Sequence, residues 1–120
     1  MKSQQSQTLK RRAEVEDSSG NVFKDLGHPD PEEALVKAKL ALQLAQIVKA
    51  NGWKQVEAAT HMGIDQPKIS KILRGQLREF SVERLLGLLR RIGCDVEIVL
   101  RKARGRPAAF RVVAEKLSRS

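Results

Sequence analysis

The chain has 120 residues, which is room for one domain, and hydrophobic residues make up 41% of it, so a modest core can form. Only 3% of the residues are aromatic, and an aliphatic core favours short packed helices over a β-sandwich. The formal net charge of +9 favours a polyanionic partner, and the single cysteine excludes an intrachain disulfide.

The sequence also argues against a metal site, a cofactor, catalysis and membrane insertion. One cysteine and two widely separated histidines do not supply a zinc ligand set. We recognise no Ser-His-Asp set, glycine-rich phosphate loop or paired carboxylates in a plausible pocket. The chain has neither the roughly 20-residue apolar run of a membrane helix nor the apolar stretch of a secretory signal. We therefore expect a non-enzymatic protein without a cofactor, located in the cytoplasm and, if it binds DNA, associated with the nucleoid.

The first part of the chain divides into an arm and the start of a domain. Residues 1–20 are polar, without apolar periodicity, and are expected to form a mobile N-terminal arm. The expected DNA-binding domain spans residues 21–93. Its first segment, residues 21–27, is a short apolar patch that is expected to pack Phe23 and Leu26 on the body.

A long helix is expected from residue 31. Asp30 can cap it, Pro31 suits its first position, and Glu33 can complete a capping box. Asn51 and Gly52 give a typical C-terminal signal. Helical spacing predicts a buried stripe formed by Leu35, Ala38, Leu42, Ala45 and Val48.

Three shorter helices and a strand are expected next. One runs from Lys54 to Met62 with Val56, Ala59 and Met62 inward, a second is capped by Asp65 and runs to Arg74, and a third is capped by Ser81 and ends at Gly93. Alternation over residues 95–100 predicts a strand, Gly105 to Pro107 a turn, and residues 110–113 a second short strand. The expected fold is all-α, with four or five helices and a short C-terminal β-strand or hairpin.

Residues 54–75 carry the strongest functional signal, a helix, a tight turn at Gly63, and a second helix. With Ile69 taken as inward, the side of the second helix that faces away is polar and basic and has no acid. This side holds Pro67, Ser70, Lys71 and Arg74, with Gln66 and Lys68 at its flanks. Its size and chemistry suit entry into the major groove of DNA.

This stretch resembles the helix-turn-helix of the Cro/CI-type (XRE family) repressors. The family pattern is matched without a gap at Gln55, Ala59, Gly63, Gln66, Ile69, Ser70, Ile72 and Gly75. The chain departs from the pattern at Ala58, Pro67 and Leu73, and the ring of Pro67 suits the first turn of the second helix. The resemblance implies a lambda-repressor-like domain and sequence-specific binding of double-stranded DNA by a transcriptional regulator, with residues 66–74 as the reading helix.

The resemblance also implies roles for individual residues. Gln55 would touch phosphate and brace the reading helix, and Gln66 would read a base, since its amide can pair with adenine. Lys71 could read guanine or grip phosphate, and Ser70 could do either. Lys54, Lys68 and Arg74 are assigned to phosphate, where a point charge is enough.

The similarity covers about residues 21–100 and extends to a small subgroup that looks similar to host-inhibition-of-growth antitoxins. Such proteins neutralise a RelE-like toxin partner and repress their own operon. An antitoxin is therefore the alternative to a dedicated repressor. An RNA- or protein-binding helix-turn-helix module is a second alternative.

The last segment, residues 94–120, is expected to be a dimerising strand followed by a basic tail. Residues 101–120 carry seven basic groups and one acidic group. Arg104-Gly105-Arg106-Pro107 matches the core of an AT-hook, which enters the minor groove, but it also reads as a hairpin turn. An unpaired strand edge with an apolar stripe favours a homodimer with Val96, Ile98 and Leu100 at its interface.

Overall fold

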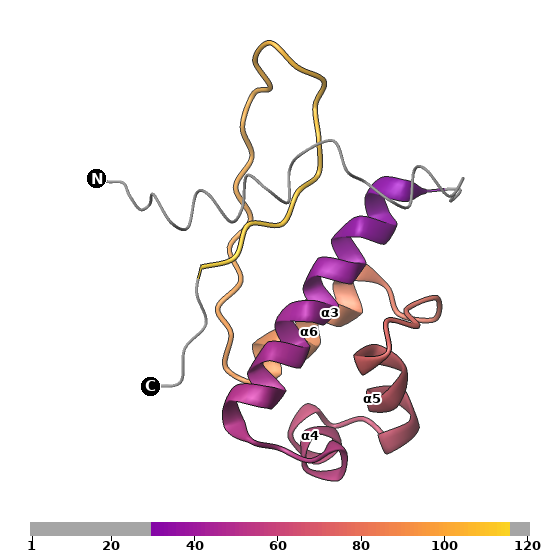
Figure 1. Cartoon of the computed structure of the whole chain (residues 1–120). Helices are drawn as coiled ribbons and strands as arrows, with labels where there is room; N and C mark the ends of the chain where they lie inside the picture. Colours follow the sequence, from indigo (N-terminus) through magenta and orange to yellow (C-terminus); the bar gives the residue numbers. More distant parts are fainter. Residues whose placement is uncertain (1–29, 116–120) are drawn as a thin grey trace.

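The computed structural model describes residues 30–115, and within this range the chain forms four α-helices and no β-strand. In chain order they are α3 (Pro31–Asn51), α4 (Gln55–Met62), α5 (Gln66–Leu73) and α6 (Val82–Arg91). The long helix α3 packs along α6, and the α4–α5 pair lies against both (Figure 1). The expectation of an all-α fold is confirmed. The expected arm at residues 1–20 and the patch at 21–27 lie outside the described residues.

Helix α3 begins and ends at the residues that the sequence indicates. The Asp30 carboxylate accepts a hydrogen bond from the Glu33 backbone N–H at 3.1 Å, and Pro31 opens the helix. At the other end Gly52 adopts a left-handed conformation with φ of 68°. Its N–H donates to the Lys49 carbonyl at 3.0 Å, which satisfies one of the carbonyls left free at a helix end.

An aliphatic core lies where the four helices meet. Leu44 of α3, Ile69 of α5 and Leu85 of α6 are fully buried. The buried face of α3 is not the one predicted. It is formed by Ala34, Val36, Leu40, Ala41, Leu44 and Val48, so the predicted stripe is correct only at Val48. Leu42 remains 48% exposed. In α4, likewise, Ala59 and Met62 are buried as expected, whereas Val56 is exposed.

The predicted C-terminal β-strand is wrong for the described part of the chain. Residues 94–115, which we name the C-terminal arm, run away from α6, turn at Gly105 and return without forming a strand (Figure 1). The returning half is anchored elsewhere, because the Phe110 N–H donates to the Glu32 carboxylate of α3 at 2.7 Å. Alternation favours an extended backbone, but a strand also needs a hydrogen-bonded neighbour, and the described part of the arm forms no strand pairing.

None of the helices within residues 30–115 combines the length and the apolar character needed to cross a membrane.

Candidate nucleic-acid interface

Helix α4 is fixed at its start by polar contacts and an aromatic pair. The Glu57 carboxylate accepts from the Lys54 N–H at 2.7 Å, which leaves the side chains of Lys54 and Gln55 exposed at the entrance to the helix. The Trp53 ring stacks on the His61 ring, with centroids 4.0 Å apart and planes 12° from parallel. This stack links Trp53, which precedes the N-cap residue Lys54, to the last turn of α4.

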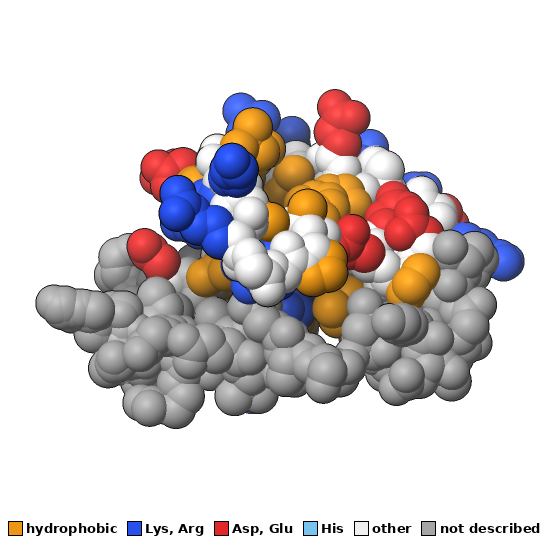
Figure 2. Space-filling view, turned by 90° about the horizontal axis from the view of Figure 1, so that it is seen from above, with side chains coloured by type: hydrophobic (Ala, Val, Ile, Leu, Met, Phe, Trp, Pro, Cys, Tyr) orange, Lys and Arg blue, Asp and Glu red, His pale blue; other side chains and the backbone are white. Residues whose placement is uncertain are grey.

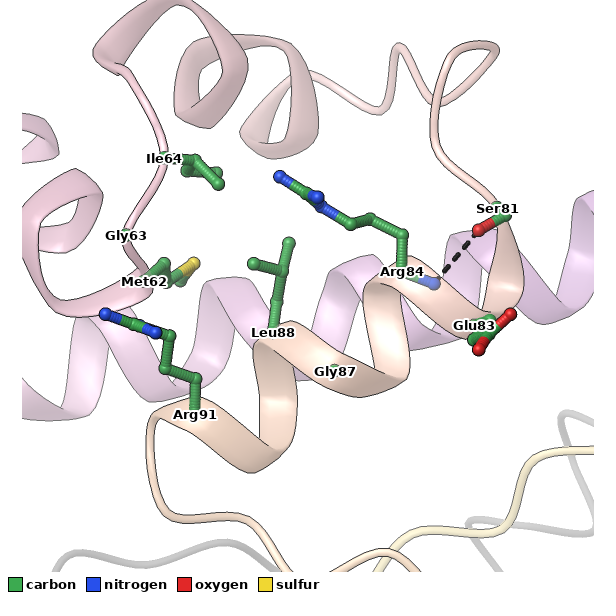
Figure 3. A pocket seen from close by; sticks show the side chains of 9 residues that line it. All are labelled: Met62, Gly63, Ile64, Ser81, Glu83, Arg84, Gly87, Leu88 and Arg91. Atoms are coloured by element: carbon green, nitrogen blue, oxygen red, sulfur yellow. Dashed lines mark hydrogen bonds between the residues drawn. The ribbon is translucent and has the colours of Figure 1, made fainter.

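The turn between α4 and α5 depends on Gly63 for two reasons. Its φ is 71°, in the left-handed region that favours glycine. Arg91 of α6 also lies directly over it, because a Cβ at Gly63 would come within 2.8 Å of the Arg91 guanidinium carbon. Figure 3 shows the Arg91 side chain extending from α6 toward this turn, where its Nε donates to the His61 carbonyl at 3.3 Å. The turn is therefore clamped to α6.

Helix α5 is capped by Asp65, as predicted. The Asp65 carboxylate accepts from the Lys68 backbone N–H at 3.0 Å, and its second oxygen lies 3.3 Å from the Lys68 Nζ. The backbone hydrogen bond is the main reason why the pKa of Asp65 lies below its ordinary value, with the Lys68 and Lys71 charges adding to the effect. The cap is therefore a carboxylate at neutral pH.

The outer face of α5 is close to the one predicted. Ile69 and Ile72 are buried, and Gln66, Pro67 and Arg74 are exposed on the other side. The remaining polar residues of α5, namely Lys68, Ser70 and Lys71, are half-buried. Of the predicted DNA-contacting residues, Gln66 and Pro67 of α5, Arg74 directly after it, and Lys54 and Gln55 at the start of α4 are thus exposed to solvent.

Three cationic side chains, two in α5 and one at its C-cap, are already engaged. Besides the contact of Lys68 with Asp65, the Lys71 Nζ lies 2.9 Å from the Glu79 carboxylate. The Arg74 Nε donates to the Ser70 carbonyl at 3.3 Å, so this side chain folds back along its own helix. Glu79 belongs to the loop between α5 and α6, and no residue pattern predicts that it lies beside α5.

A further exposed basic residue, Arg84, lies near the start of α6 and was not among the predicted site residues. Arg84 shares a shallow depression of about 340 Å³ with Lys68, and Glu79, Phe80 and Ser81 complete its lining. The Ser81 hydroxyl caps α6 by accepting from the Arg84 N–H at 3.0 Å. The sequence signal for Arg84 was its position in the first turn of a helix, where free backbone N–H groups and an arginine can together bind a phosphate.

The arm arginines do not join this surface in the same chain. Arg104 and Arg106 are exposed at the turn of the C-terminal arm, at the opposite end of the molecule from α4 (Figure 1). Viewed toward that end, Lys and Arg side chains gather beside apolar side chains on the left of the view, and acidic side chains lie on both sides of the view (Figure 2). The Arg106 guanidinium donates to the Pro107 carbonyl at 3.1 Å, which supports the turn.

The predicted dimer residues fall into two groups. Val96 is half-buried and packs on the core of its own chain. Ile98 and Leu100 are 76% and 89% exposed. Val99, Phe110 and Val113 are also exposed on the arm, so it presents several large apolar side chains to solvent.

Comparisons with known proteins agree with this geometry. A family model described as a helix-turn-helix domain matches residues 22–101. A solved structure of a protein named as an XRE family transcriptional regulator is similar to this chain, with 40% sequence identity and a TM-score of 0.66. The match covers 74% of this chain and 100% of that one. No curated protein matches the chain.

Proposed function

The chain belongs to the XRE-type helix-turn-helix family of DNA-binding transcriptional regulators, and we propose that it is a dimeric repressor that reads the major groove with α5. The observation that carries this proposal is the outer face of α5. Gln66 and Arg74 are exposed there with no Asp or Glu in the helix, and the buried Ile69 and Ile72 fix the opposite side to the core. A helix held in this way can enter the groove without losing its packing.

The proposed division of work follows from the chemistry of each side chain. Gln66, at the exposed start of α5, reads a base, because an amide can both donate to and accept from adenine. Lys71 reads guanine or contacts phosphate, and Ser70 contacts either a base or a phosphate. Phosphate contacts come from Lys54, Gln55, Lys68 and Arg74, with Pro67 contributing only apolar contact.

The test is a binding titration of the protein against a duplex from the upstream region of its own gene and against a scrambled duplex. Both are measured at 50 and 200 mM salt, and a single-stranded RNA of equal length is included. Tighter binding to the upstream duplex supports the proposal. Equal affinity for the two duplexes would contradict specific recognition, and preference for the RNA would favour the RNA-binding alternative.

A substitution in α5 sharpens this test. Gln66→Ala is expected to lower affinity for the upstream duplex by about 1–3 kcal/mol and to relax preference at one base pair, because one two-point base contact is removed. Gln46→Ala is the matched control, since Gln46 is an exposed glutamine of α3. Equal losses for the two variants would mean that Gln66 has no special contact with DNA.

The proposed dimer forms through the C-terminal arm. Two-fold pairing of arms would cover Ile98 and Leu100 and give each extended backbone a hydrogen-bonding neighbour. Two copies of α5 would then lie about one DNA turn, roughly 34 Å, apart. Ile98→Asp is expected to dissociate the dimer in sedimentation, whereas Leu42→Asp, which adds the same charge at an exposed leucine of α3, is expected to leave it intact. A dimer unaffected by Ile98→Asp would contradict this arrangement.

The antitoxin is the second candidate, and the exposed apolar side chains of the arm favour a protein partner of this kind as well. A neighbouring gene for a small basic ribonuclease would identify that partner. Mixing the two purified proteins would then be expected to form a stable complex and to stop RNA cleavage. If cleavage continues in the complex, the antitoxin role is wrong.

A further inference from the structure

Two lysines of α5 are each paired with an acidic side chain, and one of these two acids also caps the helix. Asp65 caps α5 through the Lys68 N–H, so its contact with the Lys68 ammonium accompanies a structural role. Glu79 lies in the loop before α6, and its carboxylate lies 2.9 Å from the Lys71 Nζ. Both side chains of this second pair are about two-fifths exposed, at 42% and 43%. The pair is therefore accessible from solvent, and its lysine belongs to the helix proposed to face DNA.

A paired lysine interacts with DNA phosphates differently from an unpaired one. Non-specific affinity depends on the number of phosphates that cations neutralise, and each neutralised phosphate releases counterions. If Lys71 moves from Glu79 to a phosphate, it exchanges one anion for another and leaves a carboxylate beside the backbone. The exchange therefore gains little, and the pair contributes little to the binding of phosphates, whatever the DNA sequence.

A base contact does not require that exchange. The Lys71 ammonium has three N–H donors, and Glu79 occupies one of them. The remaining donors can reach the uncharged acceptors of guanine, O6 and N7, while the ion pair stays intact. Lys71 can thus contact the correct base while it stays paired with Glu79, whereas contact with a phosphate requires it to leave Glu79.

We propose that Glu79 is a specificity-determining residue that keeps Lys71 from contributing to non-specific phosphate binding. This inference rests on the proposed function, because it requires α5 to face duplex DNA. It also explains why an acid is tolerated beside a reading helix that itself contains none. Removing the carboxylate should free one cation for phosphate and reduce the preference for the specific site.

The test compares Glu79→Gln with the wild-type chain on a mixed-sequence 30-base-pair duplex and on the upstream duplex. On the mixed duplex, the slope of log affinity against log salt is expected to become steeper by about one unit. The variant's affinity should consequently fall about threefold more than that of the wild type between 50 and 200 mM salt. At 50 mM salt the preference for the upstream duplex should also be smaller than in the wild type, because the freed cation favours the mixed duplex.

Two further variants separate ion pairing from the simple loss of a negative charge. Glu83→Gln changes the net charge equally at an exposed residue of α6, and it is expected to leave the slope unchanged. In a Lys71→Gln background, Glu79→Gln should have little effect on the slope, because no cation is released. An equal effect of Glu79→Gln with and without Lys71, or an effect no larger than that of Glu83→Gln, would overturn the inference.

Failure of this inference can be told apart from failure of the proposed function. If the wild-type chain prefers the upstream duplex but Glu79→Gln behaves like the wild type, only the role of Glu79 is wrong. If the wild-type chain shows no affinity for either duplex, the proposed function and the inference are both overturned.

Discussion

At the scale of single residues, Gly63 links the local sequence to the packing of the whole domain. Gly63→Ala is expected to destabilise the fold by about 2 kcal/mol, of which about 1 kcal/mol comes from the left-handed backbone and the rest from displacing Arg91. Gly52→Ala is the matched control, because Gly52 has φ of 68° but open space around its Cβ position. Urea unfolding should therefore show a larger loss at Gly63. Equal losses would mean that the clamp by Arg91 adds nothing.

The cap of α5 makes a pH-dependent contribution. The pKa of Asp65 is lowered in the folded protein, so its stabilising effect is present above the ordinary carboxyl pKa of 3.8 and is lost as the pH falls through the lowered value. Thermal melts should show that Asp65→Ala lowers Tm at pH 7 and has a smaller effect at pH 3. Ser81→Ala removes an uncharged cap, so its cost of about 1 kcal/mol should be similar at both values. A pH-independent effect at Asp65 would contradict the role of its charge.

The only cysteine of the chain should be a slow nucleophile. Burial, and secondarily the nearby Asp95 charge, raise the pKa of the Cys94 thiol, so less thiolate is present at neutral pH than for an ordinary cysteine. Alkylation by iodoacetamide at pH 7.5 is expected to be slower than alkylation of a free cysteine peptide, and to match it after unfolding in urea. Equal rates in the folded state would show that the thiol is not shielded.

At the scale of elements, short-range sequence signals predicted the helix ends well. They did not predict which face of a helix is buried, because that depends on packing against other helices. Asp30, Asp65 and Ser81 cap their helices as the sequence indicates, because capping is a contact between near neighbours. The buried face of α3 was mispredicted, since apolar residues occur almost all around this helix. Periodicity then admits more than one inward face, and only contacts with the other helices select among them.

Two leucines of α3 test which face is buried. Leu44→Ala is expected to destabilise the fold by about 2–5 kcal/mol, because Leu44 is fully buried in the core. Leu42→Ala makes the same chemical change at a side chain that is 48% exposed, and it should cost less than about 1 kcal/mol. Urea unfolding of the two variants measures the difference. The reverse order would restore the face predicted from the sequence.

At the scale of the whole molecule, the sequence could predict which residues carry charge but not where the fold places them. The motif in residues 54–75 correctly predicted that Ile69 and Ile72 face inward and that Pro67 and Arg74 face solvent. It gave no sign of the contact between Lys71 and Glu79, which depends on the path of the loop before α6. The arm strand was mispredicted because residue pattern specifies an extended backbone, whereas a sheet requires a neighbouring strand.

The position of the arm also predicts how its arginines act on DNA. Arg104 and Arg106 lie at a turn, at the end of the molecule opposite α4. The Arg106 guanidinium donates a hydrogen bond to the Pro107 carbonyl. An AT-hook core would instead place extended arginines in a narrow minor groove. We therefore expect Arg104→Gln/Arg106→Gln to weaken binding equally for duplexes with A·T-rich and G·C-rich flanks, and to flatten the salt slope by up to about two units.

These losses should also be independent of α5. Because the arm turn lies away from α5 of the same chain, combining the arginine changes with Gln66→Ala should give the sum of the separate losses, to within about 0.5 kcal/mol. Lys102→Gln serves as the control for a single charge removed from the same arm, and it should flatten the slope by at most about one unit. A loss confined to A·T-rich flanks would instead mean that the arginines leave the turn and enter the minor groove when DNA is bound.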